Sequence, residues 1–312
     1  MFFAILPAET VEPVAVLHEA PPSIPPDPPM KNQSPVSLIL ASVLTTGLLL
    51  AQTLKLDPVN PDPKGPRPVD AVDSVWIEDL TWMDVRDVLK AGKTTVIILT
   101  GGVEQNSPYL VTGKHNIVLK ACGEVIARKL GNALVAPIVA FVPEGNIDPP
   151  SLHMKYPGTI SLSADTFARL LTDICASFRA TGFQNIVLLG DSGGNQKGMK
   201  DVAAALNAKW TDGKVRVHFI PEFYNYPAVA KWLEDRGGKQ VDEGLHDNFA
   251  ITSIMMTVDP LLVRHKQRVA AKKSTINGVD IADLAKIVEW GRKVVEYSAE
   301  GTVKAIQKAI EK

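Results

Sequence analysis

The amino-acid sequence predicts an α/β protein with a mainly parallel sheet and helices on both faces. Two observations carry this prediction: several short runs are apolar along their whole length, and a stretch with helical spacing follows each of the first three. Strands buried on both faces show this pattern, because helices cover both sides of a parallel sheet. With 312 residues, of which 46% are hydrophobic and 21% charged, the chain can bury a full core as one large or two modest domains.

The predicted elements begin near residue 74 and alternate in type. Short runs of β-branched and apolar residues indicate strands, and apolar residues three and four positions apart indicate helices. Ser163 is expected to be a helix N-cap. In chain order we expect a strand at 94–100, a helix at 116–130, a strand at 133–142, a helix at 164–180, a strand at 185–189, a helix at 195–210 and a strand at 215–220.

Residues 1–73 are expected to lie outside the folded body. Fourteen of the 23 prolines fall between residues 7 and 68, and such a segment has too few backbone donors and too little apolar periodicity to join a packed core. We expect the α/β body to span 74–264. The segment 265–312 is predicted to be a helical extension that packs on the body or on a neighbouring copy.

An uncharged stretch at 36–54 follows Met30 and Lys31 and is typical of the apolar region of a signal peptide. We therefore expect the protein to be periplasmic or secreted, with cleavage after Ala51. Leu49 is larger than the small residue usual at the third position before a cleavage site. A retained membrane anchor is the alternative.

Charge and cysteine content argue against two classes of protein. Lys and Arg total 33 and Asp and Glu total 34, and no basic run is interleaved with aromatic residues, so no nucleic-acid partner is expected. The two cysteines, Cys122 and Cys175, are too few for a disulfide scaffold and lack the spacing of a zinc knuckle. Cys175 falls on an apolar helical stripe and is expected in the core.

Polar side chains gather after three of the predicted strands, where parallel sheets bind their ligands. A carboxylate, an imidazole and a second carboxylate from separate strand ends can converge on one divalent cation. A single residue of this kind is more often a helix cap or a solvated loop residue, so the shared placement is what points to a site. The candidates are Glu104, Asn106, Tyr109 and His115 after the first strand, His153 after the second, and Asp191, Ser192, Gly193, Gly194 and Asn195 after the third.

Four motifs, in this order, resemble those of the creatininase family, which comprises creatinine amidohydrolase and related metal-dependent amidohydrolases. They are GGVEQNSPYLVTGKH at 101–115, HMKYPGT at 153–159, GDSGGN at 190–195 and HDNFAITS at 246–253. The resemblance covers roughly residues 76–256. It implies a three-layer sandwich, hydrolysis of an amide-like C–N bond in a small molecule, and a homo-oligomer.

The resemblance also implies a metal centre, although its ligands have changed. The family holds its metal with a Glu in the first motif, a His two residues later, the Asp that closes this motif, and the His of the third motif. Glu104 is kept, while the other positions hold Asn106, His115 and Ser192. Because Asp191 has appeared beside Ser192, we infer that an imidazole and a carboxylate have exchanged places.

The expected cofactor is zinc or manganese, as one or two ions, held by Glu104, His115 and Asp191. Three protein ligands leave one coordination position open for water, as in catalytic sites. Asn106 is a poor ligand for a second ion.

Metal-bound water is the expected nucleophile, since a bound divalent ion lowers the pKa of its water to about 7. The resemblance implies that His246 gives a proton to the leaving nitrogen and that Glu104 is catalytic as well as a ligand. Backbone amides at Gly193 and Gly194 are expected to stabilise the oxyanion. Substrate contacts are expected from Asn106, Tyr109, His153, Ser192 and Asn195, with a structural role in the Pro-Gly turn as the alternative for His153.

Two other functions remain open on the sequence alone. GDSGG is also the nucleophile motif of trypsin-like proteases, so Ser192 could be an acylated serine with His246 as its base. Ile251 replaces the Glu of the last motif, and with altered ligands the site could bind a small molecule without turnover. Metal content distinguishes an active metalloenzyme from a serine hydrolase, and turnover distinguishes both from a binding protein.

Overall fold

The computed structural model describes residues 59–238 and 240–311. The predicted signal segment near residues 30–51 lies outside the described residues, as does most of the proline-rich region. Within the described part of the chain, no helix is both long enough and apolar enough to cross a membrane.

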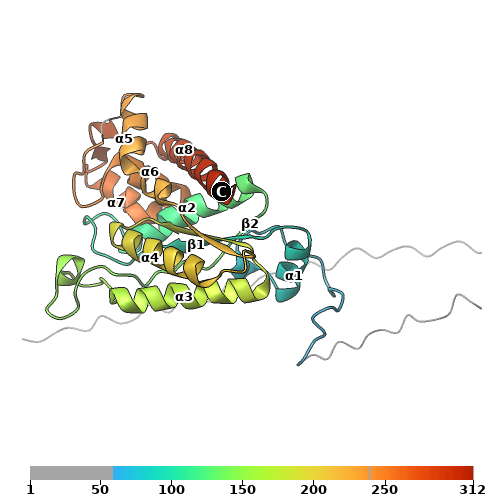
Figure 1. Cartoon of the computed structure of the whole chain (residues 1–312). Coiled ribbons are helices and arrows are strands. Elements are labelled where there is room, and N and C mark those ends of the chain that lie inside the picture. Colours follow the sequence, from blue (N-terminus) through green and yellow to red (C-terminus); the bar gives the residue numbers. More distant parts are fainter. Residues whose placement is uncertain (1–58, 239, 312) are drawn as a thin grey trace, which may run out of the picture. The chain divides into compact units, whose positions relative to one another are not determined.

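A four-stranded parallel sheet forms the centre of the described structure (Figure 1). Its strands, in the spatial order β2-β1-β3-β4, are β1 (Thr95–Thr100), β2 (Ala133–Val135), β3 (Asn185–Gly190) and β4 (Arg216–Phe219). All six residues of β1 are buried, as expected for a strand covered on both faces. The predicted α/β class with a mainly parallel sheet is confirmed.

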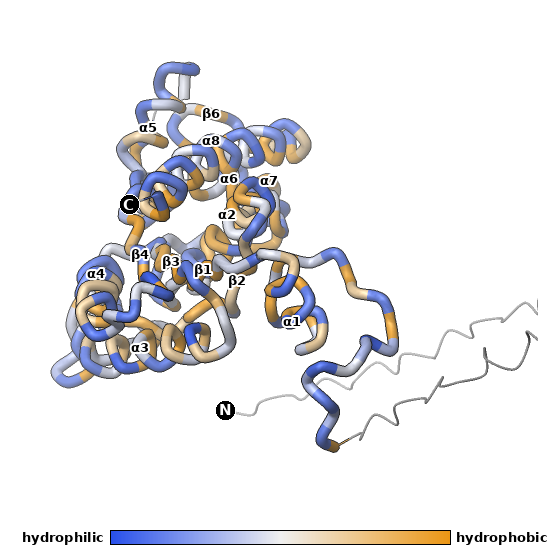
Figure 2. Tube along the Cα trace, turned by 45° about the vertical axis from the view of Figure 1, so that its right-hand side comes forward, coloured by the Kyte–Doolittle hydropathy of each residue, from blue (hydrophilic) through white to orange (hydrophobic). Residues whose placement is uncertain are grey.

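Two helical layers cover the sheet (Figure 1). Side chains of β1 alternate between them: Ile97 and Leu99 join the core under α2, α6 and α8, whereas Val96 and Ile98 join the core over α3 and α4. Figure 2 shows hydrophilic residues on the outer side of α3 and α4. The helices are α1 (Trp82–Lys90), α2 (Lys114–Leu130), α3 (Ala164–Thr181), α4 (Gly193–Lys209), α5 (Tyr226–Glu234), α6 (Phe249–Val258), α7 (His265–Ala270) and α8 (Leu284–Ile310).

Helix α8 makes up most of the C-terminal segment and packs on α2 and α6 of the same chain. A two-stranded antiparallel ribbon, β5 (Thr275–Ile276) and β6 (Val279–Asp280), precedes α8. Four 3-10 helices complete the described elements: η1 (Ile77–Asp79), η2 (Leu152–Lys155), η3 (Pro221–Tyr224) and η4 (Pro260–Val263).

Two boundaries differ from the prediction in ways that matter for the site. The strand expected at 133–142 ends at Val135: Ala136 N–H still donates to Ile97, but the next bond to β1 is from Val139 to Leu99, so the regular ladder breaks around Pro137. Helix α4 begins at Gly193 instead of residue 195, because the Ser192 hydroxyl accepts the Gly194 N–H and caps the helix.

Candidate functional site

A cluster of buried charged side chains lies at the carboxyl ends of the strands, the edge that parallel topology predicts for a ligand site. Glu104 follows β1, Asp191 follows β3 directly, and Glu144 lies in the loop after β2. Lys114 and His115 occupy the first turn of α2. All five residues are buried, so each must find a compensating partner.

His115 lies between two carboxylates. Its Nδ1 is 2.7 Å from Asp191 Oδ2, and its Nε2 is 2.7 Å from Glu104 Oε1. Burial lowers the pKa of His115, but the hydrogen bonds to Asp191 and Glu104 leave that pKa raised above its usual value. Burial likewise opposes ionisation of Glu104, yet the hydrogen bond and charge of His115 hold the pKa of this carboxyl at about 2. The structure thus brings together Glu104, His115 and Asp191, the three residues that the sequence suggested as neighbours.

Lys114 brings an amine into the same cluster. Its Nζ lies 2.9 Å and 3.1 Å from the two ring nitrogens of His115. The same atom is 3.9 Å from Glu104 Oε1 and 3.9 Å from Asp191 Oδ2. Burial lowers the pKa of Lys114, and the nearby carboxylates oppose this shift.

Glu144 completes the cluster and is incompletely satisfied. Its Oε1 is buried and has no hydrogen-bond partner among the described residues. Burial and the adjacent Glu104 carboxylate raise the pKa of Glu144 to about 8. Gly102 makes room for this oxygen, because a Cβ there would collide with Glu144 Oε1. A buried acceptor without a donor is costly, which indicates that a cation or proton belongs beside it.

Two further histidines face Glu104 from the open side of the cluster. His153 Nε2 is 3.2 Å from Glu104 Oε2, and His246 Nδ1 is 3.1 Å from Glu104 Oε1. Their side chains are 25% and 26% exposed, so they are the part of this cluster that solvent reaches. Burial and the charge of Lys114 lower the pKa of His246 to about 4, which makes its imidazole neutral near pH 7.

Several residues expected to contact substrate use their polar atoms within the protein. Asn106 Nδ2 donates to the backbone carbonyls of Glu104 and Val111, and its Oδ1 lies 2.8 Å from His246 Nδ1. Asn195 Nδ2 donates to the carbonyl of Gly101, 2.8 Å away, and so ties α4 to the end of β1, whereas its buried Oδ1 has no hydrogen-bond partner among the described residues.

The remaining candidates surround the cluster. The guanidinium carbon of Arg268 lies over the ring of Tyr109, 4.5 Å from the ring centroid. The hydroxyl of Ser192 caps α4. Gly193 and Gly194 are exposed in the first turn of α4, and Gly194 could not carry a Cβ because the carbonyl oxygen of Pro143 would lie 2.6 Å away.

Sequence reasoning missed three members of the site. Glu144 was visible only as one polar residue in a long loop, and Lys114 only as a lysine beside His115, a residue type that is normally exposed. The third is Tyr226, whose hydroxyl donates a 2.6 Å hydrogen bond to Asp191 Oδ1. No local pattern marked this tyrosine, because it lies 35 residues after its partner.

The donor set fits one divalent cation. Glu104, His115 and Glu144 each offer a ligand atom, and these atoms lie within 4.8 Å of one another. Two carboxylates and one imidazole suit zinc or manganese. The unpartnered Glu144 oxygen provides a structural reason for a cation here. Asp191 is placed to orient His115 through the other ring nitrogen, as carboxylates do beside metal-bound histidines.

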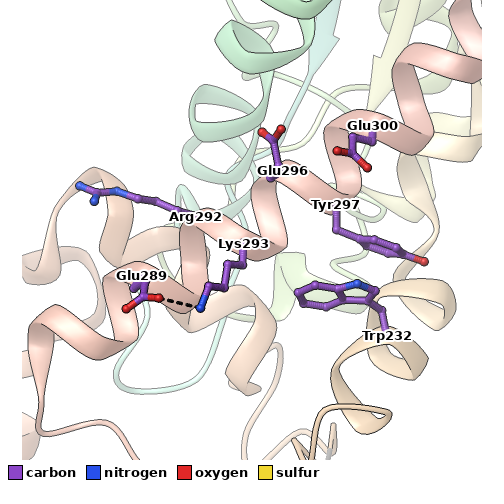
Figure 3. A pocket seen from close by; sticks show the side chains of 7 residues that line it. All are labelled: Trp232, Glu289, Arg292, Lys293, Glu296, Tyr297 and Glu300. Atoms are coloured by element: carbon purple, nitrogen blue, oxygen red, sulfur yellow. Dashed lines mark ion pairs between the residues drawn. The ribbon is translucent and has the colours of Figure 1, made fainter.

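A separate hollow of about 500 Å³ lies between α5 and α8 and shares no residue with this cluster (Figure 3). Trp232 and Tyr297 stack in it with ring centroids 4.9 Å apart. Lys293 pairs with Glu289 at its edge. Glu296, also at this hollow, pairs with Lys129. The buried charged side chains that could carry out chemistry lie in the cluster at the strand ends.

Fold and cluster together define an α/β protein with a candidate metal centre at the carboxyl edge of its sheet. Residues 78–311 match the family model of creatininase, described as creatinine amidohydrolase. The chain belongs to the creatininase family, which confirms the resemblance found in its motifs. At the level of this family it is a hydrolase.

Comparisons with individual proteins agree with this assignment. A 3-dehydro-scyllo-inosose hydrolase of Thermotoga maritima is 28% identical over 119 residues, which are 38% of this chain and 36% of the relative. The match thus spans about a third of that enzyme.

Solved creatininases share the fold. The structure of creatinine amidohydrolase (creatininase) has 23% identity and a TM-score of 0.55, and the match covers 76% of this chain and 99% of that one. A structure described as "Creatininase Mn" has 22% identity and a TM-score of 0.53, with 75% and 98% covered. A creatininase mutant described as "Zn-Zn type" has 22% identity and a TM-score of 0.54, with 76% and 98% covered.

Proposed function

We propose that this protein hydrolyses an amide-like C–N bond in a small molecule with the aid of a divalent cation bound by Glu104, His115 and Glu144. The observation that carries this proposal is the buried, unpartnered Oε1 of Glu144 beside a second carboxylate. A cation at this point would satisfy that oxygen and keep both carboxylates ionised. The zinc and manganese named for solved creatininases are the first ions to test.

The cation would supply Lewis acidity and lower the pKa of water. The protein's own residues would position the reactants. Asp191 holds the ring of His115 through Nδ1, so that Nε2 remains directed at Glu104 and would be available to the cation. With the cation bound, His115 would be neutral, and its Nδ1–H would donate to Asp191.

His246 is suited to proton transfer because its imidazole is neutral near pH 7. Asn106 Oδ1 accepts a hydrogen bond from Nδ1 and fixes the ring, which leaves Nε2 to accept a proton and pass it to the leaving nitrogen. The exposed start of α4 at Gly193 and Gly194 places the positive end of a helix dipole near the cluster, where it would favour developing negative charge.

A serine hydrolase is less well supported. The Ser192 hydroxyl caps α4 by accepting the Gly194 N–H, and among the described residues no histidine is hydrogen-bonded to it. Its position matches a structural role in the helix start.

Export to the periplasm, a homo-oligomeric state and the absence of a nucleic-acid partner are further proposals. They rest on the uncharged stretch at 36–54, on the family resemblance and on the balanced charge, respectively.

The test combines metal analysis with a substrate screen. Protein purified without added metal would be analysed for bound ions and assayed on small amides, lactams and, because of the Thermotoga relative, cyclic polyol ketones. We expect a chelator to abolish turnover and added zinc or manganese to restore it. Glu144→Gln should lose metal and activity, whereas the control Ser192→Ala should keep both. Turnover that resists chelation and disappears in Ser192→Ala would establish the serine hydrolase instead.

A further inference from the structure

Lys114 is a buried lysine in the first turn of a helix, and local structure does not favour it there. Its side chain is 1% exposed. A positive charge near a helix N-terminus is repelled by the helix dipole, and a buried ammonium is costly unless it is paired. The compensation must therefore come from the residues that surround Nζ.

These surroundings consist of the candidate site itself. Lys114 Nζ contacts His115 and lies 3.9 Å from one oxygen each of Glu104 and Asp191. At this distance in a buried environment the attraction to two carboxylates is strong, although neither contact is a hydrogen bond. The amine thus adds a positive charge near both carboxylates, beside the imidazole that separates them.

We propose that the Lys114 ammonium takes the place of a divalent cation in this cluster, so that removing its charge allows the site to bind one additional ion. This proposal rests on the proposed function, in which Glu104, His115 and Glu144 would hold the first ion. The charges agree with it. The three carboxylates Glu104, Glu144 and Asp191 are balanced by one divalent ion and one ammonium when His115 is neutral.

A second divalent ion beside the lysine would leave the buried site with excess positive charge. Without the lysine, Glu104 and Asp191 would share only the neutral imidazole of His115 between them, and Asp191 would have no cation beside it. The lysine therefore sets how many metal ions the protein can hold.

The experiment counts ions per chain. Folded parent and variant proteins would be saturated with Mn²⁺, freed of excess ion by gel filtration, and analysed by elemental mass spectrometry and calorimetric titration. Lys114→Ala and Lys114→Gln should each bind one ion more than the parent. Lys114→Arg keeps the charge and should match the parent, as should Lys120→Ala, which removes an exposed lysine from the same helix.

The outcomes separate this role of Lys114 from the proposed function. One ion in the parent and two in the variants supports both. No ion in the parent and one in the variants supports the role of Lys114 and contradicts metal-dependent hydrolysis. Equal counts in parent and variants overturn the role of Lys114 whatever the parent binds, and two ions in the parent overturn it too. If circular dichroism shows that neither neutral variant folds even with Mn²⁺ present, the lysine is structural and the proposal fails.

Discussion

Two buried clusters of charge lie close together in this protein, and they differ in how completely their polar atoms are paired. In the first, Arg268 donates to Asp247 Oδ1 at 3.0 Å and to the carbonyl of Lys273 at 3.1 Å. Its guanidinium covers the ring of Tyr109, and Asp247 also accepts from the Thr252 hydroxyl. Both charged side chains are almost fully buried.

The second cluster, around Glu104 and His115, leaves Glu144 Oε1 without a partner and opens to solvent through His153 and His246. Charges that satisfy one another completely have no capacity for a ligand, whereas an unsatisfied buried oxygen does. Asp247 of the paired cluster directly follows His246 and lies just before α6, and its partner Arg268 lies on α7. The paired cluster therefore holds the segment that delivers His246 to the site.

The largest effect is expected from breaking the paired cluster. Arg268→Met should lower the free energy of unfolding by about 3–5 kcal/mol, because it leaves Asp247 buried without its counter-charge. Urea unfolding followed by circular dichroism measures this, with the exposed Arg292→Met as control. The metal content of the folded fraction should not change. A loss below about 1 kcal/mol would mean that the two clusters do not differ as described.

A smaller effect should follow from loosening the unsatisfied cluster. Tyr226→Phe removes the hydroxyl that holds Asp191, and Asp191 in turn orients His115. Loss of such a supporting hydrogen bond typically weakens metal binding about 10–100-fold. Calorimetric titration with Zn²⁺ would show it. Tyr224→Phe, a neighbouring hydroxyl with no bond to Asp191, should keep the parent affinity, and equal affinities in all three proteins would remove Asp191 from the metal site.

The smallest effect should come from Ser192. Although it lies next to Asp191, its hydroxyl is already paired with the Gly194 N–H. Ser192→Ala removes the cap of α4 and should cost about 1 kcal/mol of stability. Activity per folded molecule should change by no more than a few-fold. Thermal unfolding and steady-state assays on the same sample test both statements. Ser192→Thr retains a capping hydroxyl and should restore most of the stability.

The sequence predicted those parts of the fold that local signals determine. β1, β3 and α3 lie within one residue of their expected ends, because apolar runs and the Ser163 cap are local features. The expected strand at 133–142 was too long, because an apolar run does not show that the regular ladder with β1 breaks around Pro137.

The site was predicted only in part. Glu104, His115 and Asp191 meet as expected, since the ends of β1 and β3 and the start of α2 lie at the same edge of the sheet. Glu144 and Lys114 were missed because burial of a single charged side chain leaves no periodic signal in the sequence. Whether Gly193 and other predicted contact residues bind substrate stays a prediction.

The origin of the three candidate ligands has a thermodynamic consequence. Glu104, His115 and Glu144 come from three segments that only the folded sheet brings together, so an unfolded chain cannot offer the same set of donors. An ion that binds only the native state stabilises it by mass action, by about 2.7 kcal/mol when the free ion is at a hundred times its dissociation constant. The melting temperature of this protein should therefore depend on metal concentration, and measured stabilities will be comparable only at a fixed concentration of free ion.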